Sequence, residues 1–216
     1  MSEFAIGAML YFAKSFDRFV EQSVRSEWRR YWLDELTGRK LTILGMGHIG
    51  GALAERAGVF GMDVVGVRRS ATGKTELPTV IGFDHLEARL AATDFLVVCL
   101  PLTAETSGMV DSRLLSGLKD GAVLVDISRG GVVSEAAVLE ALDSGRLRGA
   151  ALDVFEEEPL SNESRLWGHP RVLLTPHVSG TAPRYMERAI DVFLQNVSSL
   201  AETGRPCTPV DPALGY

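Results

Sequence analysis

The sequence predicts an α/β fold built on a doubly wound parallel sheet. Short apolar segments alternate with amphipathic helical segments from residue 40 onward, and a glycine-rich turn follows the first apolar segment. Apolar strands in this arrangement are covered by helices on both faces of a parallel sheet. The 216 residues, 46% of them hydrophobic, can bury the core of one large domain or of one and a half domains.

Residues 3–36 are predicted to form one long helix or two joined helices. Apolar side chains recur there every three or four residues, at Met9, Phe12, Phe16, Phe19, Val20, Val24, Trp28 and Trp32. This aromatic face packs either on its own domain or on a second subunit, and its bulk favours the second subunit. We therefore expect residues 1–36 to be a helical segment at the contact of a homodimer.

The remaining elements follow from apolar runs and helical periodicity. Strands are expected at residues 40–44, 63–67, 95–100, 122–127, 150–154 and 172–174. Helices are expected at residues 49–60, 84–91, 134–144 and 182–201, with Ser134 as a cap and a proline-rich tail from 206 to 216.

Composition narrows the class of protein. The net charge is -6 and no run of Lys or Arg stands out, which disfavours nucleic acid as a partner. Glu3, Lys14 and Asp17 interrupt the apolar N-terminus, so no membrane segment or signal peptide is expected. Two cysteines make no disulfide framework, so we expect a reducing cytoplasm, and no cluster has metal-ligand spacing.

The glycine-rich turn has the spacing of a dinucleotide-binding loop. Gly45, Gly47 and Gly50 form G-x-G-x-x-G between a predicted strand and a predicted helix. Gly45 allows the tight turn, Gly47 lets the backbone approach a pyrophosphate, and Gly50 lets the helix lie close to the strand. The helix then offers its first N–H groups to the phosphates. The alternative is a glycine-rich turn without a ligand.

The end of the second strand indicates which dinucleotide is preferred. NAD-binding proteins usually place an acid there, but this strand ends in Arg68, Arg69 and Ser70. Asp63 lies at the wrong end of the strand, and Glu76 lies well past it. Two guanidinium groups and a hydroxyl suit a 2′-phosphate, so the prediction is NADP, with NAD possible if both arginines are merely solvated.

Three further segments, residues 125–132, 150–159 and 173–180, carry ionisable residues where predicted strands end. Together with the glycine loop, they resemble the D-2-hydroxyacid dehydrogenases, the family of glyoxylate/hydroxypyruvate reductases and phosphoglycerate dehydrogenase. The resemblance covers nearly the whole chain, from Glu3 to Tyr216. Its motifs are Leu100-Pro101-Leu102-Thr103 with Thr106, Ser128-Arg129-Gly130, Leu152-Asp153-Val154-Phe155 with Glu158-Pro159, and Thr175-Pro176-His177.

The resemblance implies the reduction of a small 2-oxo acid, such as glyoxylate or hydroxypyruvate, with a cofactor that supplies hydride. Arg129 would bind the substrate carboxylate and polarise the oxo group, His177 would be the general acid, and Glu158 would orient His177 and raise its pKa. Glu158 is chosen over Glu156 and Glu157 by resemblance alone. The implied cofactor-binding set is Gly45, Gly47, His48, Ile49, Gly50, Arg68, Arg69, Ser70, Leu100, Pro101, Thr106, Ile127, Asp153 and Gly180.

The predicted division is a dinucleotide-binding domain at residues 37–181 and a remnant of the substrate domain at residues 182–216. The chain begins where the family's N-terminal substrate region should already have ended, so we expect a fragment, a misplaced start or a truncated product with little turnover. The alternative is a cofactor sensor or dimeric scaffold without catalysis. Asp126, where relatives often have Asn, is a departure for which the sequence alone predicts no consequence.

Overall fold

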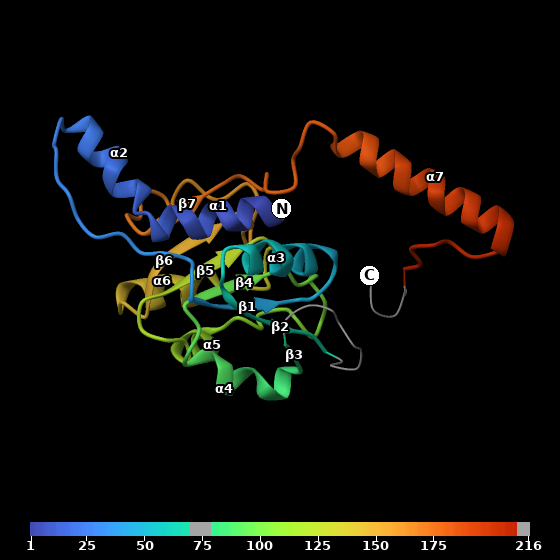
Figure 1. Ribbon diagram of the computed structural model, residues 1–216, viewed down its shortest axis with the longest axis horizontal. Coiled ribbons are helices and arrows are strands. Elements are labelled where there is room, and N and C mark those ends of the chain that lie inside the picture. The colour runs from blue at the N-terminus through green and yellow to red at the C-terminus, as the bar shows by residue number, and fades with distance from the viewer. Residues whose placement is uncertain (70–78, 211–216) are drawn as a thin grey trace. The chain divides into compact units, whose positions relative to one another are not determined.

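The computed structural model describes residues 1–69 and 79–210 (Figure 1). The chain forms two compact units, Met1–Pro176 and His177–Tyr216. Within the described residues, the first unit holds a seven-stranded parallel sheet in the order β3-β2-β1-β4-β5-β6-β7. This is the doubly wound order that the alternation of strands and helices predicts.

The strands are β1 (Lys40–Leu44), β2 (Asp63–Val67), β3 (Val80–Ile81), β4 (Phe95–Val98), β5 (Ala122–Asp126), β6 (Leu147–Leu152) and β7 (Val172–Leu174). The helices are α1 (Ser2–Ala13), α2 (Phe16–Val24), α3 (His48–Val59), the 3-10 turn η1 (Phe83–His85), α4 (Leu86–Leu90), α5 (Ser112–Ser116), α6 (Glu135–Asp143) and α7 (Tyr185–Thr203). The direction of the strand order reverses between β1 and β4, where doubly wound sheets bind their ligands.

Two hydrophobic cores cover the two faces of the sheet. Side chains alternate along each strand, so Phe95 and Val97 of β4 face one core while Leu96 and Val98 face the other. The first core is closed by α1 and α3, which pack on each other, and the second by α4, α5 and α6 (Figure 1). Burial on both faces explains why these strands are almost wholly apolar.

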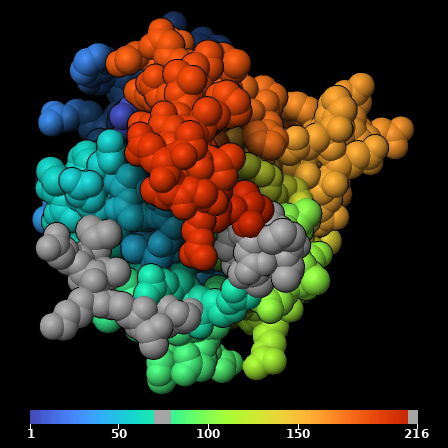
Figure 2. All heavy atoms as spheres, turned by 90° about the vertical axis from the view of Figure 1, so that its right-hand side faces the viewer, coloured from blue at the N-terminus to red at the C-terminus, as the bar shows by residue number. Residues whose placement is uncertain are grey.

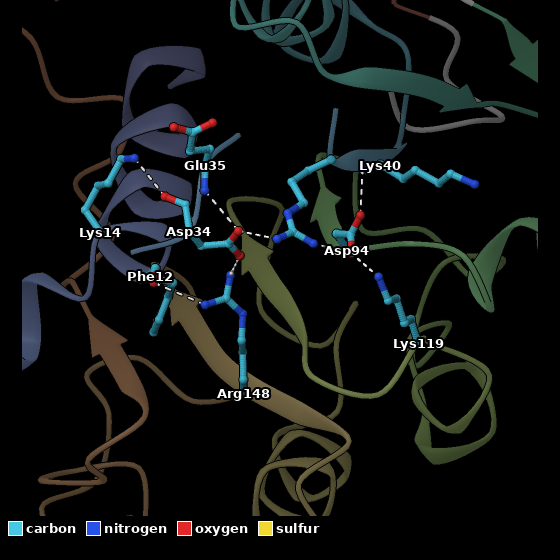
Figure 3. A network of polar contacts seen from close by, with 9 residues as sticks. Phe12, Lys14, Asp34, Glu35, Lys40, Asp94, Lys119 and Arg148 are labelled. Atoms are coloured by element: carbon cyan, nitrogen blue, oxygen red, sulfur yellow. Dashed lines mark hydrogen bonds and ion pairs between the residues drawn. The ribbon is translucent and has the colours of Figure 1, made fainter. Parts of the chain in front are cut away.

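A network of charged residues lies at the amino ends of the strands (Figure 3). The Asp34 carboxylate contacts the guanidinium groups of Arg39 and Arg148, the latter at 3.3 Å. Lys14 Nζ donates to the Asp34 carbonyl at 2.7 Å. Asp94 accepts from Lys119 Nζ at 2.6 Å and from the Lys40 N–H at 2.9 Å. These contacts join the end of α1 and the chain entering β1 to the sheet.

The prediction of helix throughout residues 3–36 is wrong beyond residue 24. Ser15, with φ 50°, separates α1 from α2, and Ser26, with φ 53°, follows the end of α2. The chain then folds back on α2: Gln22 Nε2 donates to the Tyr31 hydroxyl at 2.6 Å, and the Tyr31 ring stacks on Phe19. Tertiary contacts therefore replace helix despite the helical spacing of the aromatic residues.

The apolar side chains of residues 3–36 also fall into two groups. Met9 and Phe12 of α1 are buried in the first unit's own core. Residues 16–33, which we term the aromatic arm, expose most of their apolar side chains instead, and Trp28 and Trp32 are 92% and 101% exposed. Packing on its own domain is therefore correct for α1, whereas the aromatic arm displays an apolar surface.

The second unit consists of α7 and the segments beside it. The residue after α7, Gly204, has φ 73°, and the chain then turns back so that the Thr208 N–H donates to Asn196 Oδ1 at 2.9 Å. The helix α7, orange-red in Figure 2, has exposed apolar side chains along its length. No helix in the part of the chain that the structure describes is long and apolar enough to cross a membrane.

Candidate cofactor and active site

The phosphate loop is built as its glycine spacing predicts. Gly45 follows β1 with φ +101°, and a Cβ there would lie 2.8 Å from the Cys99 carbonyl oxygen. A Cβ on Gly50 would overlap the Gly45 carbonyl. Both positions therefore require glycine for the fold itself, which brings α3 close against β1.

Gly47 is different, because the fold places nothing against it. It is the N-cap of α3, and no atom of the described residues lies within 4 Å of where its Cβ would stand. Having no side chain, it leaves the first N–H groups of α3 open toward the solvent side of the loop. His48 and Ile49 follow on the first turn, with His48 exposed. This open cradle of N–H groups suits the pyrophosphate of a dinucleotide.

The carboxyl end of β2 carries Arg68 and Arg69, as the sequence indicates. The Arg68 N–H donates to the Ile81 carbonyl of β3 at 3.1 Å, which extends the strand pairing to this residue. Arg69 Nη1 contacts Glu105 Oε2 at 3.1 Å. Asp63 lies at the opposite end of β2, where it pairs with Arg89 at 3.1 Å. Ser70, the third residue of the predicted phosphate-binding set, lies outside the described residues.

The loop after β4 forms a compact turn at the same edge. Leu100 is buried and Pro101 is partly exposed. Thr106 Oγ1 donates to the Pro101 carbonyl at 2.6 Å and accepts from the Thr103 N–H at 2.8 Å. These bonds fix the turn beside the phosphate loop.

A chain of polar contacts holds Arg129 at the carboxyl end of β5. Asp126 Oδ1 accepts from the Ser128 N–H at 3.0 Å and from Ser128 Oγ at 2.5 Å. The Ser128 carbonyl accepts from Arg129 Nη1 at 2.7 Å. Ile127 and Ser128 are buried, whereas Arg129 is exposed at the edge of the sheet. A Cβ on Gly130 would overlap the Phe155 carbonyl, so this turn packs directly on the segment after β6.

Two buried carboxyl groups lie side by side at this edge. Asp153 follows β6, is fully buried, and accepts from Thr175 Oγ1 at 2.6 Å, while its N–H donates to the Asp126 carbonyl at 3.1 Å. Burial raises the pKa of Asp126 to about 7; the Ser128 hydrogen bonds lower it and the charge of Asp153 raises it further. Burial and the nearby Asp126 also raise the pKa of the Cys99 thiol to about 12, which keeps it protonated.

Two of the three consecutive acids after β6 make different contacts. Glu156 and Glu135 exchange hydrogen bonds, each carboxylate accepting from the other's N–H at 2.9 and 2.7 Å. Glu156 is therefore engaged at the start of α6 rather than simply solvated. Glu158 is exposed, and its Oε1 accepts from the Phe155 N–H at 3.1 Å, which directs its carboxylate back toward the end of β6.

His177 and Gly180 belong to the second unit, whereas the other predicted site residues that the structure describes belong to the first. His177 is exposed and has φ 52°, a left-handed conformation that is uncommon for a residue other than glycine and that often occurs at functional sites. The first unit thus brings the phosphate loop, Arg69, Arg129 and Asp153 to one edge of its sheet.

The structure gives contacts at this edge to three residues for which the sequence predicts no role. Glu105 pairs with Arg69, Ser128 links Asp126 to Arg129, and Thr175 binds Asp153. Ser128 and Thr175 belong to the motifs themselves, whereas the only sequence signal for Glu105 is its position beside the motif residue Thr106. In the described ranges, no group of three or more His, Cys, Asp or Glu side chains could hold a metal ion.

The fold and its phosphate loop define a Rossmann-type dinucleotide-binding domain. Residues 6–179 match the NAD-binding domain of the D-isomer specific 2-hydroxyacid dehydrogenases. The chain belongs to this family.

Individual relatives agree with the family. Glyoxylate/hydroxypyruvate reductase A of Salmonella newport is 39% identical over 220 residues, a match that covers all of this chain and 69% of the relative. Among solved structures, the NADPH-dependent glyoxylate/hydroxypyruvate reductase of Sinorhizobium meliloti, in complex with NADP and sulfate, has a TM-score of 0.91 and 35% identity over all of this chain and 69% of that one. A D-isomer specific 2-hydroxyacid dehydrogenase of Xanthobacter autotrophicus, in complex with NADPH and MES, has a TM-score of 0.90 and 33% identity over 100% of this chain and 88% of that one.

Proposed function

We propose that this chain carries the cofactor site and the catalytic residues of an NADPH-dependent reductase for small 2-oxo acids of the glyoxylate or hydroxypyruvate type. One observation carries the proposal: an open glycine cradle, two arginines after β2 and the exposed Arg129 lie at one edge of the sheet. The names of the relatives support the same substrate class.

The cofactor would lie along this edge with its phosphates at the phosphate loop. Gly45, Gly47 and Gly50 let the backbone approach the pyrophosphate, and His48 and Ile49 begin the helix that faces it. Arg68 and Arg69, with Ser70, would bind the 2′-phosphate, which favours NADP over NAD. Leu100, Pro101 and Thr106 would line the adenosine side, and Ile127, Asp153 and Gly180 the nicotinamide side.

When bound, the cofactor supplies the hydride, and the chain's own residues bind and polarise the substrate. Arg129 would hold the substrate carboxylate and withdraw charge from the oxo oxygen, because a guanidinium offers a fixed fork of donors. His177 would protonate that oxygen, and Glu158 would orient His177. In the direction of oxidation, His177 would accept the proton.

The test is steady-state oxidation of NADPH with glyoxylate, hydroxypyruvate and pyruvate. His177→Ala should reduce turnover by about a hundredfold or more, the usual contribution of a general acid. His85→Ala is the matched control, since His85 is exposed and contacts only the neighbouring Asp84 among the ion pairs described. Equal rates in the His177→Ala variant and its parent would remove His177 from the mechanism.

We further propose that residues 1–216, assayed by themselves, bind NADPH but turn over slowly. Arg129 and Glu158 are both exposed, so water competes for the groups that must orient the substrate. A non-catalytic cofactor sensor or scaffold is the second candidate, supported by the unpartnered apolar surface of the aromatic arm. Turnover at rates ordinary for such reductases would exclude both slow turnover and the scaffold.

The proposed assembly is a homodimer formed through the aromatic arm. Its exposed apolar residues include Phe16, Val20, Trp28 and Trp32, and apolar surface on this scale marks interaction sites. Light scattering should show twice the chain mass at micromolar concentration, and a Trp28→Ala, Trp32→Ala double variant should be monomeric. A monomeric parent with α2 folded contradicts the proposal. We also place the protein in the cytoplasm, where Cys99 and Cys207 would stay reduced.

A further inference from the structure

The contact between Arg69 and Glu105 joins two loops that lie on either side of the phosphate loop. Arg69 follows β2 and Glu105 lies in the turn after β4, and both strands pair with β1. Because the three strands are parallel, their carboxyl ends meet at one edge, and the ion pair spans the end of β1 where the phosphate loop begins. An acid is thus placed directly on a guanidinium that the proposed cofactor site uses.

The turn that carries Glu105 is well fixed. Thr103 and Thr106 hydrogen-bond each other through backbone and side-chain atoms, and Thr106 Oγ1 also donates to the Pro101 carbonyl at 2.6 Å. Glu105 therefore projects from a constrained turn toward the end of β2. Both side chains remain solvated, with Arg69 51% and Glu105 67% exposed, so the ion pair can exchange for another anion.

We propose that Glu105 is a specificity-determining residue that competes with the cofactor's 2′-phosphate for Arg69. This inference rests on the proposed binding of NADPH. The 2′-phosphate carries close to two negative charges, whereas the corresponding hydroxyl of NADH carries none. A carboxylate on Arg69 occupies one of the guanidinium donors and repels the phosphate, but it has little effect on the hydroxyl. Glu105 therefore lowers the preference for NADPH that the two arginines create.

The expected effect is modest because the pair is exposed. Charge interactions at such sites change a binding constant by about twofold to fivefold at low salt, and less as salt screens them. In Glu105→Gln, the negative charge is lost but the shape of the side chain and one acceptor oxygen are kept. Binding of NADPH should tighten about twofold to fivefold, while binding of NADH should stay unchanged.

The experiment measures the dissociation constants of NADPH and NADH by nicotinamide fluorescence at low ionic strength, without any substrate. Three proteins are compared: the parent, Glu105→Gln and Glu87→Gln. Glu87 is the matched control because it also forms an exposed ion pair, with Arg113 at 3.7 Å, and lies outside the proposed site. A fourth variant, Arg69→Gln with Glu105→Gln, should lose the gain in NADPH affinity, since the competed group is gone.

The ratio of the two dissociation constants decides the proposal. A rise in NADPH selectivity in Glu105→Gln, absent from Glu87→Gln and abolished with Arg69→Gln, supports it. An unchanged ratio overturns the proposal. Weaker NADPH binding in Glu105→Gln also overturns it, because Glu105 would then orient Arg69 for the phosphate. Failure of the proposed function gives a different result, because the parent would then bind NADH as tightly as NADPH. The change in the ratio caused by Glu105→Gln would still decide the role of Glu105.

Discussion

The acidic side chains at the two edges of the sheet have opposite kinds of partner. At the amino edge, Asp34 and Asp94 each contact cationic side chains, Arg39 and Arg148 for the first and Lys119 for the second. At the carboxyl edge, Asp126 accepts its hydrogen bonds from Ser128 and lies near a second buried carboxyl group, Asp153. The amino edge is therefore arranged for stability, whereas the carboxyl edge buries Asp126 where its charge costs stability.

This difference shows in the direction of the pKa shifts. Burial alone would raise the pKa of Asp94, but hydrogen bonds from Lys119 and the Lys40 N–H, with the charges of Lys119 and Arg39, hold it below its usual value. Burial raises the pKa of Asp126 to about 7 because the hydrogen bonds from Ser128 do not offset it. Buried groups with perturbed pKa values are common at functional sites, so this contrast agrees with the site that we propose at the carboxyl edge.

The largest expected effect is at Asp126. Folding raises the pKa of this acid, so the folded protein is most stable where the acid is protonated in both states, below the unfolded pKa. That stability is lost as the pH rises toward the folded pKa of about 7. The shift of Asp126 from 3.8 to about 7 corresponds to about 4 kcal/mol between pH 4 and pH 8. Asp126→Asn should therefore gain stability relative to the parent as pH rises, measured by urea unfolding across this range. A difference that does not change with pH would show that Asp126 titrates normally.

The next largest effect is at Arg148 on the amino edge. Its guanidinium donates to the Phe12 carbonyl at 3.2 Å, contacts Asp34 and lies over the Phe95 ring. Arg148→Met keeps most of the aliphatic stem and removes these contacts, so the free energy of unfolding should fall by about 2 kcal/mol. Arg165→Met is the control, because its pair with Asp143 is exposed and should contribute less than about 0.5 kcal/mol. Equal losses in the two variants would contradict a special role for the amino edge.

A smaller effect with the opposite pH dependence is expected at Asp94. A carboxyl group with a lowered pKa stabilises the folded state above its unfolded pKa, and this contribution is lost as pH falls through the folded value. Asp94→Asn should cost about 1 kcal/mol at pH 7 and progressively less in acid. Asp120→Asn, at an exposed acid beside Arg146, is the control and should stay within about 0.5 kcal/mol at all pH values. A loss that persists unchanged in acid would refute the assignment.

How far the sequence predicts these features depends on whether they are local. The bounds of β1, β2 and β7 are as expected, and Ser134 caps α6 through its Oγ as predicted, because apolar runs and capping chemistry are short-range. The aromatic arm is not helical after residue 24, since the contacts of Tyr31 with Gln22 and Phe19 compete with helix. The short elements β3 and α5 were not expected either, because such segments carry little periodicity.

The site divides in the same way. The roles of Gly45 and Gly50 follow from loop spacing, and their Cβ positions confirm why glycine is needed. The pKa of Asp126 could not be predicted, because it depends on the burial created by strands distant in sequence. Likewise, the pairing of Arg69 with Glu105 joins residues that are 36 positions apart, and only the parallel order of β2, β1 and β4 brings them together.

A substitution at Gly47 should have the smallest effect on stability but a large effect on the binding of NADPH. Serine is at least as favourable as glycine at a helix N-cap, and no described atom lies within 4 Å of where its Cβ would stand. Gly47→Ser should therefore change the free energy of unfolding by no more than about 0.5 kcal/mol. The added side chain would occupy the cradle and cap the N–H groups proposed for the pyrophosphate, so NADPH binding should weaken by about tenfold or more.

Ser134 provides the reciprocal control, because its Oγ accepts from the Ala137 N–H at the start of α6, away from the phosphate loop. Ser134→Ala should lower stability by about 1 kcal/mol and leave NADPH binding unchanged. Fluorescence titration and thermal unfolding on the same samples measure both quantities. If Gly47→Ser binds NADPH as tightly as the parent, the open space at Gly47 does not receive the phosphates. If Gly47→Ser instead loses stability as well as NADPH binding, glycine is required at position 47 by the fold, as it is at Gly45 and Gly50, and the loss of binding does not locate the phosphates.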